Sequence, residues 1–160
     1  ATQLEIVHSL AVASGTRGMA GGQALDLAAV GQSLTLPELE MMHIHKTGAL
    51  IRAAVQMGAL CGRSEPPALE RLDHYAKCMG LAFQVVDDVL DADASTATLG
   101  KTAGKDAAQG KPTYVSVLGL GRAKEFAEEL LADAHSTLEP LGPRAQRLHE
   151  LADFIVHRKF

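Results

Sequence analysis

A long stretch of helical periodicity places the strongest limit on the fold of this chain. It begins after Ser64-Glu65-Pro66-Pro67 and weakens after Asp93. Between these points apolar residues recur every three or four positions, at Leu69, Leu72, Tyr75, Ala76, Met79, Phe83, Val86 and Leu90. Because apolar residues on a half-buried strand would alternate instead, this spacing predicts one long helix.

The remainder of the chain is also typical of helices. Alanine is the commonest residue, aromatic residues make up 4% of the chain, Trp is absent, and no sustained strand-like alternation occurs. These features predict an all-α protein with closely packed helices. The other expected helices run from the N-terminus to about 14, over 17–30, over 35–62, and over 112–120, 121–139 and 143–158.

Composition and charge exclude several classes of protein. Apolar residues make up 47% and charged residues 21%, which is not the composition of a disordered chain. The net charge of −4 disfavours a nucleic-acid-binding surface. No apolar run reaches the ~18 residues that a membrane span needs. The first residues also lack the basic start and apolar block of a signal peptide.

The spacing of the cysteines and histidines matches neither a disulfide framework nor a metal-binding motif. Cys61 and Cys78 are too few for a disulfide framework and have no metal-ligand spacing, so a reducing, cytoplasmic location is expected. The seven histidines show no paired metal spacing either. His43 and His45 are two residues apart and do not share a helix face, so we interpret them as structural or exposed.

The most informative polar residues lie on the long helix. At 100° per residue, a single arc of about 100° holds Gln84, Asp87, Asp88 and Asp91. Carboxylates spaced in this way repel one another, and their neighbours are strongly apolar, so nearby cations are expected. Oxygen ligands of this kind suit Mg²⁺, with Mn²⁺ as a second choice, shared with substrate phosphates. The alternative is a solvated acidic helix end.

Other polar positions fit a diphosphate site less specifically. Lys46-Thr47 is expected in the middle of a helix, where burying an unpaired lysine would be costly. Either an anionic ligand offsets that cost, or the lysine side chain extends to the surface and keeps its amine in solvent. The segment Gly21-Gly22-Gln23-Ala24-Leu25-Asp26 is more typical of tight helix packing than of chemistry. Lys101, Lys105 and Lys111 lie in a stretch without periodicity, and fit either a cationic lid or a solvated loop.

Five ordered motifs together resemble the short-chain trans-isoprenyl diphosphate synthases. They are Gly-Gly-Gln-Ala-Leu-Asp-Leu at 21–27, His-Lys-Thr-Gly-Ala-Leu-Ile at 45–51, Phe-Gln-Val-Val-Asp-Asp-Val-Leu-Asp at 83–91, Leu-Gly-Lys at 99–101 and Gly-Lys-Pro-Thr-Tyr at 110–114. The resemblance spans nearly the whole chain and is strongest toward the bacterial farnesyl diphosphate synthase (geranyltranstransferase) branch.

This resemblance implies an all-α isoprenoid (terpenoid) synthase bundle, in which two aspartate-rich motifs hold Mg²⁺ on an allylic diphosphate. The second motif would supply the metal ligands Asp87, Asp88 and Asp91. The residues implied to contact the diphosphate are Lys46, Thr47, Gln84, Lys101 and, as a further candidate, Lys111. The implied catalytic residues are Lys46, Asp87 and Lys101. The resemblance also implies a homodimer, and a basic tail at Arg158-Lys159 that approaches isopentenyl diphosphate.

The chain differs from this family because the first aspartate-rich motif and its following arginines are absent. Residues 1–160 are therefore expected to be the C-terminal half of a single polyprenyl synthetase domain. The implied reaction joins dimethylallyl or geranyl diphosphate to isopentenyl diphosphate by Mg²⁺-assisted ionisation, giving farnesyl diphosphate. The absent motif favours inactivity of this piece alone. The alternative is a non-catalytic helical subunit or interaction module derived from the same fold.

Overall fold

The computed structural model describes residues 2–97 and 110–159, and within them every regular element is a helix. The α-helices are α1 (Thr2–Ser14), α2 (Met19–Ala28), α3 (Leu36–His43), α4 (Ala49–Cys61), α5 (Pro66–Ala97), α7 (Tyr114–Leu118), α8 (Leu120–Leu138) and α9 (Gln146–His157). A π-helical turn, η1 (Ile44–Gly48), joins α3 to α4, and a 3₁₀ segment, η2 (Glu139–Ala145), joins α8 to α9. The predicted all-α fold is confirmed.

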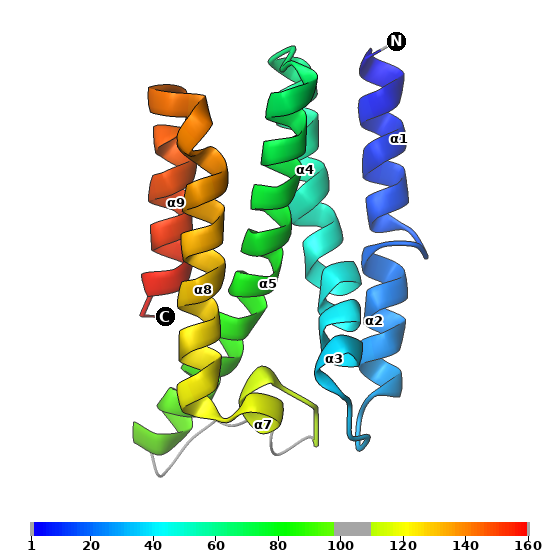
Figure 1. Cartoon of the computed structure of the whole chain (residues 1–160). Coiled ribbons are helices and arrows are strands. Elements are labelled where there is room, and N and C mark those ends of the chain that lie inside the picture. The colour runs from blue at the N-terminus through cyan, green and yellow to red at the C-terminus, as the bar shows by residue number, and fades with distance from the viewer. Residues whose placement is uncertain (1, 98–109, 160) are drawn as a thin grey trace.

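Helix α5 runs through the middle of the bundle (Figure 1). On one side it packs against η1 and α4, and α1 and α2 lie outside them. On its other side it packs against α8, which in turn packs against α9. The short helix α7 contacts α5 and α8 near one end of the bundle. The long helix expected from periodicity is therefore the central element.

The core forms where α5 meets α8. Buried on α5 are Tyr75, Ala76, Cys78, Met79, Ala82, Val85, Val86 and Val89, and buried on α8 are Ala123, Ala127, Leu131, Ala134 and Leu138. Small alanine side chains let the two helices approach closely, as the alanine content predicts. The Tyr75 hydroxyl donates a hydrogen bond to the Leu148 carbonyl oxygen at 3.0 Å, which links α5 to α9.

The helix expected over 35–62 begins as predicted but is not uniform. Glu38 accepts hydrogen bonds from the Thr35 backbone N–H at 2.8 Å and the Thr35 hydroxyl at 2.7 Å, closing a capping box. The α-helical ladder then gives way to the π-helical turn at η1 before α4 resumes. Such turns are frequent at functional sites, and the 3.6-residue period of the sequence did not predict one here.

Two glycines allow η1 to lie in close contact with two other helices. A Cβ added at Gly22 of α2 would lie 2.1 Å from the backbone nitrogen of Lys46. A Cβ added at Gly80 of α5 would lie 2.9 Å from the Cα atom of Gly48. Both distances are shorter than normal packing contacts, so η1 reaches its place only because both positions lack a side chain.

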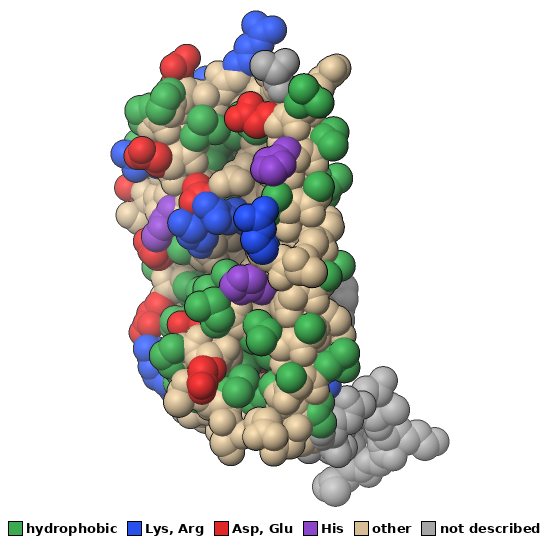
Figure 2. Space-filling model, turned by 90° about the vertical axis from the view of Figure 1, so that its right-hand side faces the viewer, with side chains coloured by type: hydrophobic (Ala, Val, Ile, Leu, Met, Phe, Trp, Pro, Cys, Tyr) green, Lys and Arg blue, Asp and Glu red, His purple; other side chains and the backbone are tan. Residues whose placement is uncertain are grey.

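Several large apolar side chains on α1, on α2 and just after α2 are exposed to solvent: Leu4, Val7, Leu10, Met19, Leu25, Leu27 and Val30. Figure 2 views this side of the molecule, where hydrophobic side chains surround a central group of Lys and Arg side chains. In the described part of the chain, no helix has the length and apolar content to cross a bilayer.

We expect Gly80→Ala to lower the free energy of unfolding by about 1–2 kcal/mol. Overpacking against the Gly48 backbone costs about 1–3 kcal/mol, which exceeds the gain of up to about 1 kcal/mol in helix propensity. Gly58→Ala in α4 is the matched control, because a Cβ there meets nothing within 4 Å and only the propensity gain remains. Urea unfolding of both variants tests this expectation. If both substitutions change the free energy of unfolding equally and in the same direction, the close contact between Gly80 and η1 is contradicted.

Candidate functional site

A small polar cavity lies where α2, η1, α5 and the residues before α7 meet. Its volume is about 180 Å³, and it is lined by Asp26, Met42, His43, Lys46, Gln84, Asp87, Asp88, Lys111, Pro112 and Thr113. Five of the residues singled out from the sequence, Lys46, Gln84, Asp87, Asp88 and Lys111, therefore line one cavity. They come from three separate parts of the chain.

Asp26 connects the two lysines of this cavity. The Lys46 ammonium donates a hydrogen bond to Asp26 Oδ2 at 2.8 Å, and the Lys111 ammonium lies 3.6 Å from the same oxygen. The Asp26 side chain is only 7% exposed. It lies one turn after Gly22, so the close crossing of α2 and η1 brings it to Lys46. Sequence reasoning assigned this segment to packing, and it missed Asp26 as part of the polar cluster.

The surroundings of Asp26 lower the pKa of its carboxyl group. Burial alone would raise the pKa of its carboxyl group, but the hydrogen bond and charge of Lys46, together with the charge of Lys111, outweigh burial. The net effect holds the Asp26 pKa below its ordinary value. Asp26 therefore stays ionised at neutral pH and keeps both lysines directed toward the cavity.

The carboxylates on α5 face this cluster. Gln84 Nε2 donates a hydrogen bond to Asp87 Oδ2 at 3.3 Å, and the backbone N–H of Tyr114 donates one to Asp88 Oδ2 at 2.7 Å. Asp91 lies one turn farther along α5 and is not among the residues that line the cavity. Among the described residues, the donor atoms of these three carboxylates do not converge within 4.8 Å of one another.

The cation beside Asp87 comes from the end of the chain. Arg158 hydrogen-bonds to Asp87 through its guanidinium group, donates to the Phe83 carbonyl oxygen at 3.3 Å, and stacks 4.1 Å from the Phe83 ring centroid. Its side chain is only 8% exposed. Arg158 therefore supplies a positive charge beside Asp87, whereas the resemblance implied a place for it near isopentenyl diphosphate.

His43 is the second cavity residue that sequence reasoning did not assign to the site. It is buried, and its ring stacks on Tyr114 with centroids 5.4 Å apart. The reading of His43 as structural or exposed is half right, since the ring is packed but also lines the cavity. His45 is half-buried and lies 2.8 Å from the Met41 carbonyl oxygen through Nδ1.

Among the described residues, two predicted site residues, Asp91 and Thr47, do not line this cavity. Thr47 lies on η1 and is half-buried, but it is not one of the lining residues. Lys101 falls outside the residues that the structure describes, as does Lys105.

The chemistry of the cavity suits a metal-bound diphosphate. The α5 side supplies carboxylate and amide oxygens, which are hard ligands of the kind that Mg²⁺ prefers. The opposite side supplies two ammonium groups, which attract phosphate oxygens. Two or fewer close carboxylates are sufficient for Mg²⁺, because this ion usually keeps several waters.

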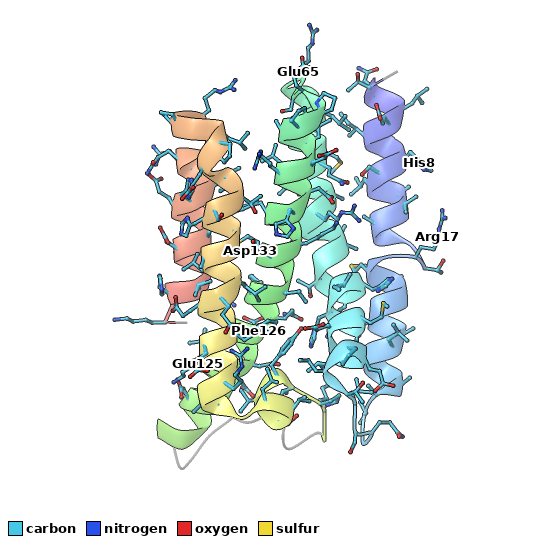
Figure 3. All side chains as sticks on the ribbon, viewed as in Figure 1. His8, Arg17, Glu65, Glu125, Phe126 and Asp133 are labelled. Carbon is cyan, nitrogen blue, oxygen red and sulfur yellow. The ribbon has the colours of Figure 1, made fainter. Side chains whose placement is uncertain are left out.

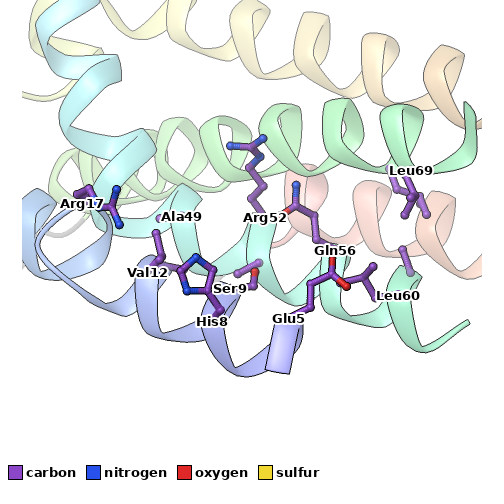
Figure 4. A pocket seen from close by; sticks show the side chains of 14 residues that line it. Glu5, His8, Ser9, Val12, Arg17, Ala49, Arg52, Gln56, Leu60 and Leu69 are labelled. Carbon is purple, nitrogen blue, oxygen red and sulfur yellow. The ribbon is translucent and has the colours of Figure 1, made fainter. Parts of the chain in front are cut away.

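A larger cavity of about 460 Å³ lies between α1, α4 and α5 (Figure 4). Its polar lining includes His8, Arg17, Arg52 and Gln56, but none of the aspartates of α5 at 87–91. The Arg52 guanidinium donates hydrogen bonds to the Asp73 carboxylate at 2.5 and 3.1 Å. None of the predicted metal-binding or diphosphate-binding residues lines this cavity, so the smaller polar cavity, which brings five of them together, is the better candidate.

Comparison with known proteins gives matches over nearly the whole chain. Residues 3–140 match the family model described as polyprenyl synthetase. The farnesyl diphosphate synthase of Escherichia coli is 49% identical over 160 residues, covering 98% of this chain and 54% of that protein. The chloroplastic geranylgeranyl pyrophosphate synthase of Capsicum annuum is 46% identical over 154 residues, covering 95% of this chain and 42% of that protein.

Solved structures agree with these matches. An FPP/GFPP synthase of Zymomonas mobilis superposes with a TM-score of 0.83 at 38% identity, covering 97% of this chain and 51% of that one. A geranyltransferase of Helicobacter pylori, complexed with magnesium and isoprenyl diphosphate, superposes with a TM-score of 0.79 at 33% identity over the same shares. The chain spans about half the length of the curated relatives it matches.

We expect acid to destabilise the fold partly through Asp26. Because folding lowers its pKa below the unfolded value of about 3.9, the ionised carboxylate adds stability above that pH. This contribution is lost as pH falls through the lowered pKa. Asp26→Asn should lower the free energy of unfolding at pH 7 by about 1–3 kcal/mol, and flatten its pH dependence below about pH 4.

Urea midpoints measured across this pH range test the expectation. Glu70→Gln is the control, because Glu70 is exposed and far from the lysines of the cavity in sequence. An aspartate carboxyl of the unfolded chain titrates between roughly pH 5 and pH 3. If Asp26→Asn and wild type lose the same free energy of unfolding over this range, the proposed role of Asp26 is wrong.

Proposed function

The chain belongs to the polyprenyl synthetase family, and from this premise we propose that its parent protein is an Mg²⁺-dependent trans-prenyltransferase. Its substrates are an allylic diphosphate, either dimethylallyl or geranyl diphosphate, and isopentenyl diphosphate, and its product is farnesyl diphosphate. Residues 1–160 form the C-terminal half of one catalytic domain. The observation that carries the proposal is the polar cavity in which Asp87 and Asp88 of α5 lie near Lys46 and Lys111.

Asp87, Asp88 and Asp91 are the proposed metal ligands. Their oxygens match the preference of Mg²⁺, or of Mn²⁺ as a substitute. The similar geranyltransferase of Helicobacter pylori was crystallised with magnesium and isoprenyl diphosphate, which supports this choice. When bound, the metal supplies positive charge that neutralises the diphosphate as it leaves.

The cationic residues of this chain bind and stabilise the same diphosphate. Lys46 and Lys111 provide ammonium charge from the side of the cavity opposite α5, and Gln84 provides an amide donor. Thr47 and Lys101 are further candidates for this contact, with Lys101 acting beside Lys46 as a catalytic residue. Because charge develops on the leaving group in the transition state, cations fixed in advance lower the barrier to ionisation.

Asp26 is the proposed positioning residue for this step. Its hydrogen bond and its negative charge hold the Lys46 ammonium group in place. Loss of diphosphate leaves an allylic cation, which the double bond of isopentenyl diphosphate attacks before a proton is lost. A dry apolar surrounding is needed at this step, because water would quench the cation.

Two further features of the parent protein are proposed. The exposed apolar side chains of α1 and α2 favour a larger assembly, for which a homodimer is the simplest symmetric form (Figure 2). Both cysteines are free thiols, which suits a reducing, cytoplasmic location.

Asp87→Ala in the full-length protein should lower kcat for prenyl transfer by at least about 10²-fold, because a charge-stabilising group is lost at the reacting diphosphate. The measurement is steady-state turnover of geranyl and isopentenyl diphosphates with Mg²⁺, with product length read by chromatography. Asp93→Ala is the matched control, since Asp93 lies on the same helix but pairs with Lys124 at 2.8 Å.

Two results would contradict the proposal. Equal losses of turnover in both variants would show that Asp87 has no special role. Unfolding of Asp87→Ala in circular dichroism, with no change in turnover per folded molecule, would show that Asp87 is a structural residue rather than a catalytic one.

A further inference from the structure

Three side chains of different metal-binding types meet between α5 and α8, away from the aspartates. His74 and Cys78 lie one turn apart on α5, and Asp133 lies on α8 (Figure 3). His74 Nε2 is 2.9 Å from Asp133 Oδ2, and the Cys78 thiol donates to the same oxygen at 3.5 Å. From Cys78 to Asp87 the helix rises about 13 Å, so this cluster is separate from the polar cavity.

The packing of α5 on α8 explains how these residues come together. An i,i+4 spacing puts His74 and Cys78 on one face of α5. Asp133 is adjacent to Ala134, which is fully buried against that face and lets the backbones approach. Asp133 is 55 residues after Cys78, so no sequence spacing could reveal the cluster.

We propose that His74, Cys78 and Asp133 form a Zn²⁺-binding site that joins α5 to α8. One donor atom from each residue lies within 4.8 Å of the other two. No other trio of His, Cys, Asp or Glu donors in the described ranges meets this limit. Donors of a tetrahedral Zn²⁺ lie roughly 3.3–3.8 Å apart, given bond lengths of about 2.0–2.3 Å, so small rotamer adjustments complete the site.

The donor set selects the metal. One imidazole nitrogen, one sulfur and one carboxylate oxygen suit Zn²⁺, whereas Mg²⁺ prefers oxygen alone. Three protein ligands leave a fourth position for water. That position has access to solvent, because the side chains of His74 and Asp133 are 49% and 54% exposed, while Cys78 forms the buried base at 4%.

Burial and the charge of Asp133 raise the pKa of Cys78 to about 12, so without metal the thiol is protonated and is not a nucleophile. Binding of Zn²⁺ displaces this proton to solvent and leaves a metal thiolate. The Asp133 carboxylate, which accepts from the thiol in the free protein, then becomes a ligand beside it. The bound ion would stabilise the packing of the α5–α8 pair by mass action.

Co²⁺ is the probe that separates this site from the aspartates. The purified chain is titrated with Co²⁺ in excess Mg²⁺, and the near-ultraviolet charge-transfer band of a cobalt thiolate is followed. We expect one equivalent to bind through sulfur and one equivalent of Zn²⁺ to remove the band. Zn²⁺ should also raise the melting temperature of wild type. Cys78→Ser should abolish the band, and His74→Ala should weaken Zn²⁺ affinity at least about 10-fold.

Two controls fix the assignment. Cys61→Ser removes the other thiol, which is exposed at the end of α4, and should leave the band unchanged. His149→Ala removes one ring of the stacked His135–His149 pair, a second place on the described surface where imidazole could bind Co²⁺, and should also leave the band unchanged. Should Cys78→Ser fail to fold, His74→Ala decides the matter, because its exposed side chain is outside the core.

The proposal is overturned by any of three results. These are absence of a thiolate band in wild type, a band that survives Cys78→Ser and disappears with Cys61→Ser, and Zn²⁺ affinity unchanged by His74→Ala. Because none of these measurements involves prenyl transfer, their outcome is independent of the proposed enzymatic function.

Discussion

The polar cavity depends on the close contact of η1 with α2 at Gly22 and with α5 at Gly80. Any side chain at either position would push η1 away from its neighbours. With α2 held against η1, Asp26 reaches the Lys46 amine. With α5 held against η1, the aspartate face of α5 lines the same cavity. The geometry of the candidate site thus depends on the absence of a side chain at Gly22 and Gly80.

Charge balance is the second organising principle of the cavity. Asp26 faces Lys46 and Lys111, and Asp87 faces Arg158, so the carboxylates are compensated by cations from distant parts of the chain. A buried carboxylate without such compensation would be costly. The same cations are the groups that would bind an anionic substrate. The cavity therefore presents carboxylates that could bind a metal ion and cations that could bind a diphosphate.

Helix α5 carries two groups of candidate metal ligands at different positions along its axis. Near Asp87 it offers hard oxygen ligands beside lysines, and near Cys78 it offers sulfur and nitrogen beside a carboxylate of α8. One continuous helix keeps these sites apart, because each turn moves the side chains about 5.4 Å along the axis. Rigid packing through buried alanines of α8 serves both sites, since it fixes the helix that carries them.

The helices and the aspartate face of α5 could be predicted from the sequence alone. Both depend on the 3.6-residue period, which fixes the relative directions of Gln84, Asp87 and Asp88 within one helix. Sequence reasoning also located Lys46 and Lys111, but it assigned Asp26 to packing, placed Arg158 elsewhere, and missed the π-helical turn. The pairs Lys46–Asp26, Arg158–Asp87 and Cys78–Asp133 join residues 20, 71 and 55 positions apart. Only the tertiary structure decides such pairs, because they depend on how closely packed helices approach rather than on local backbone geometry.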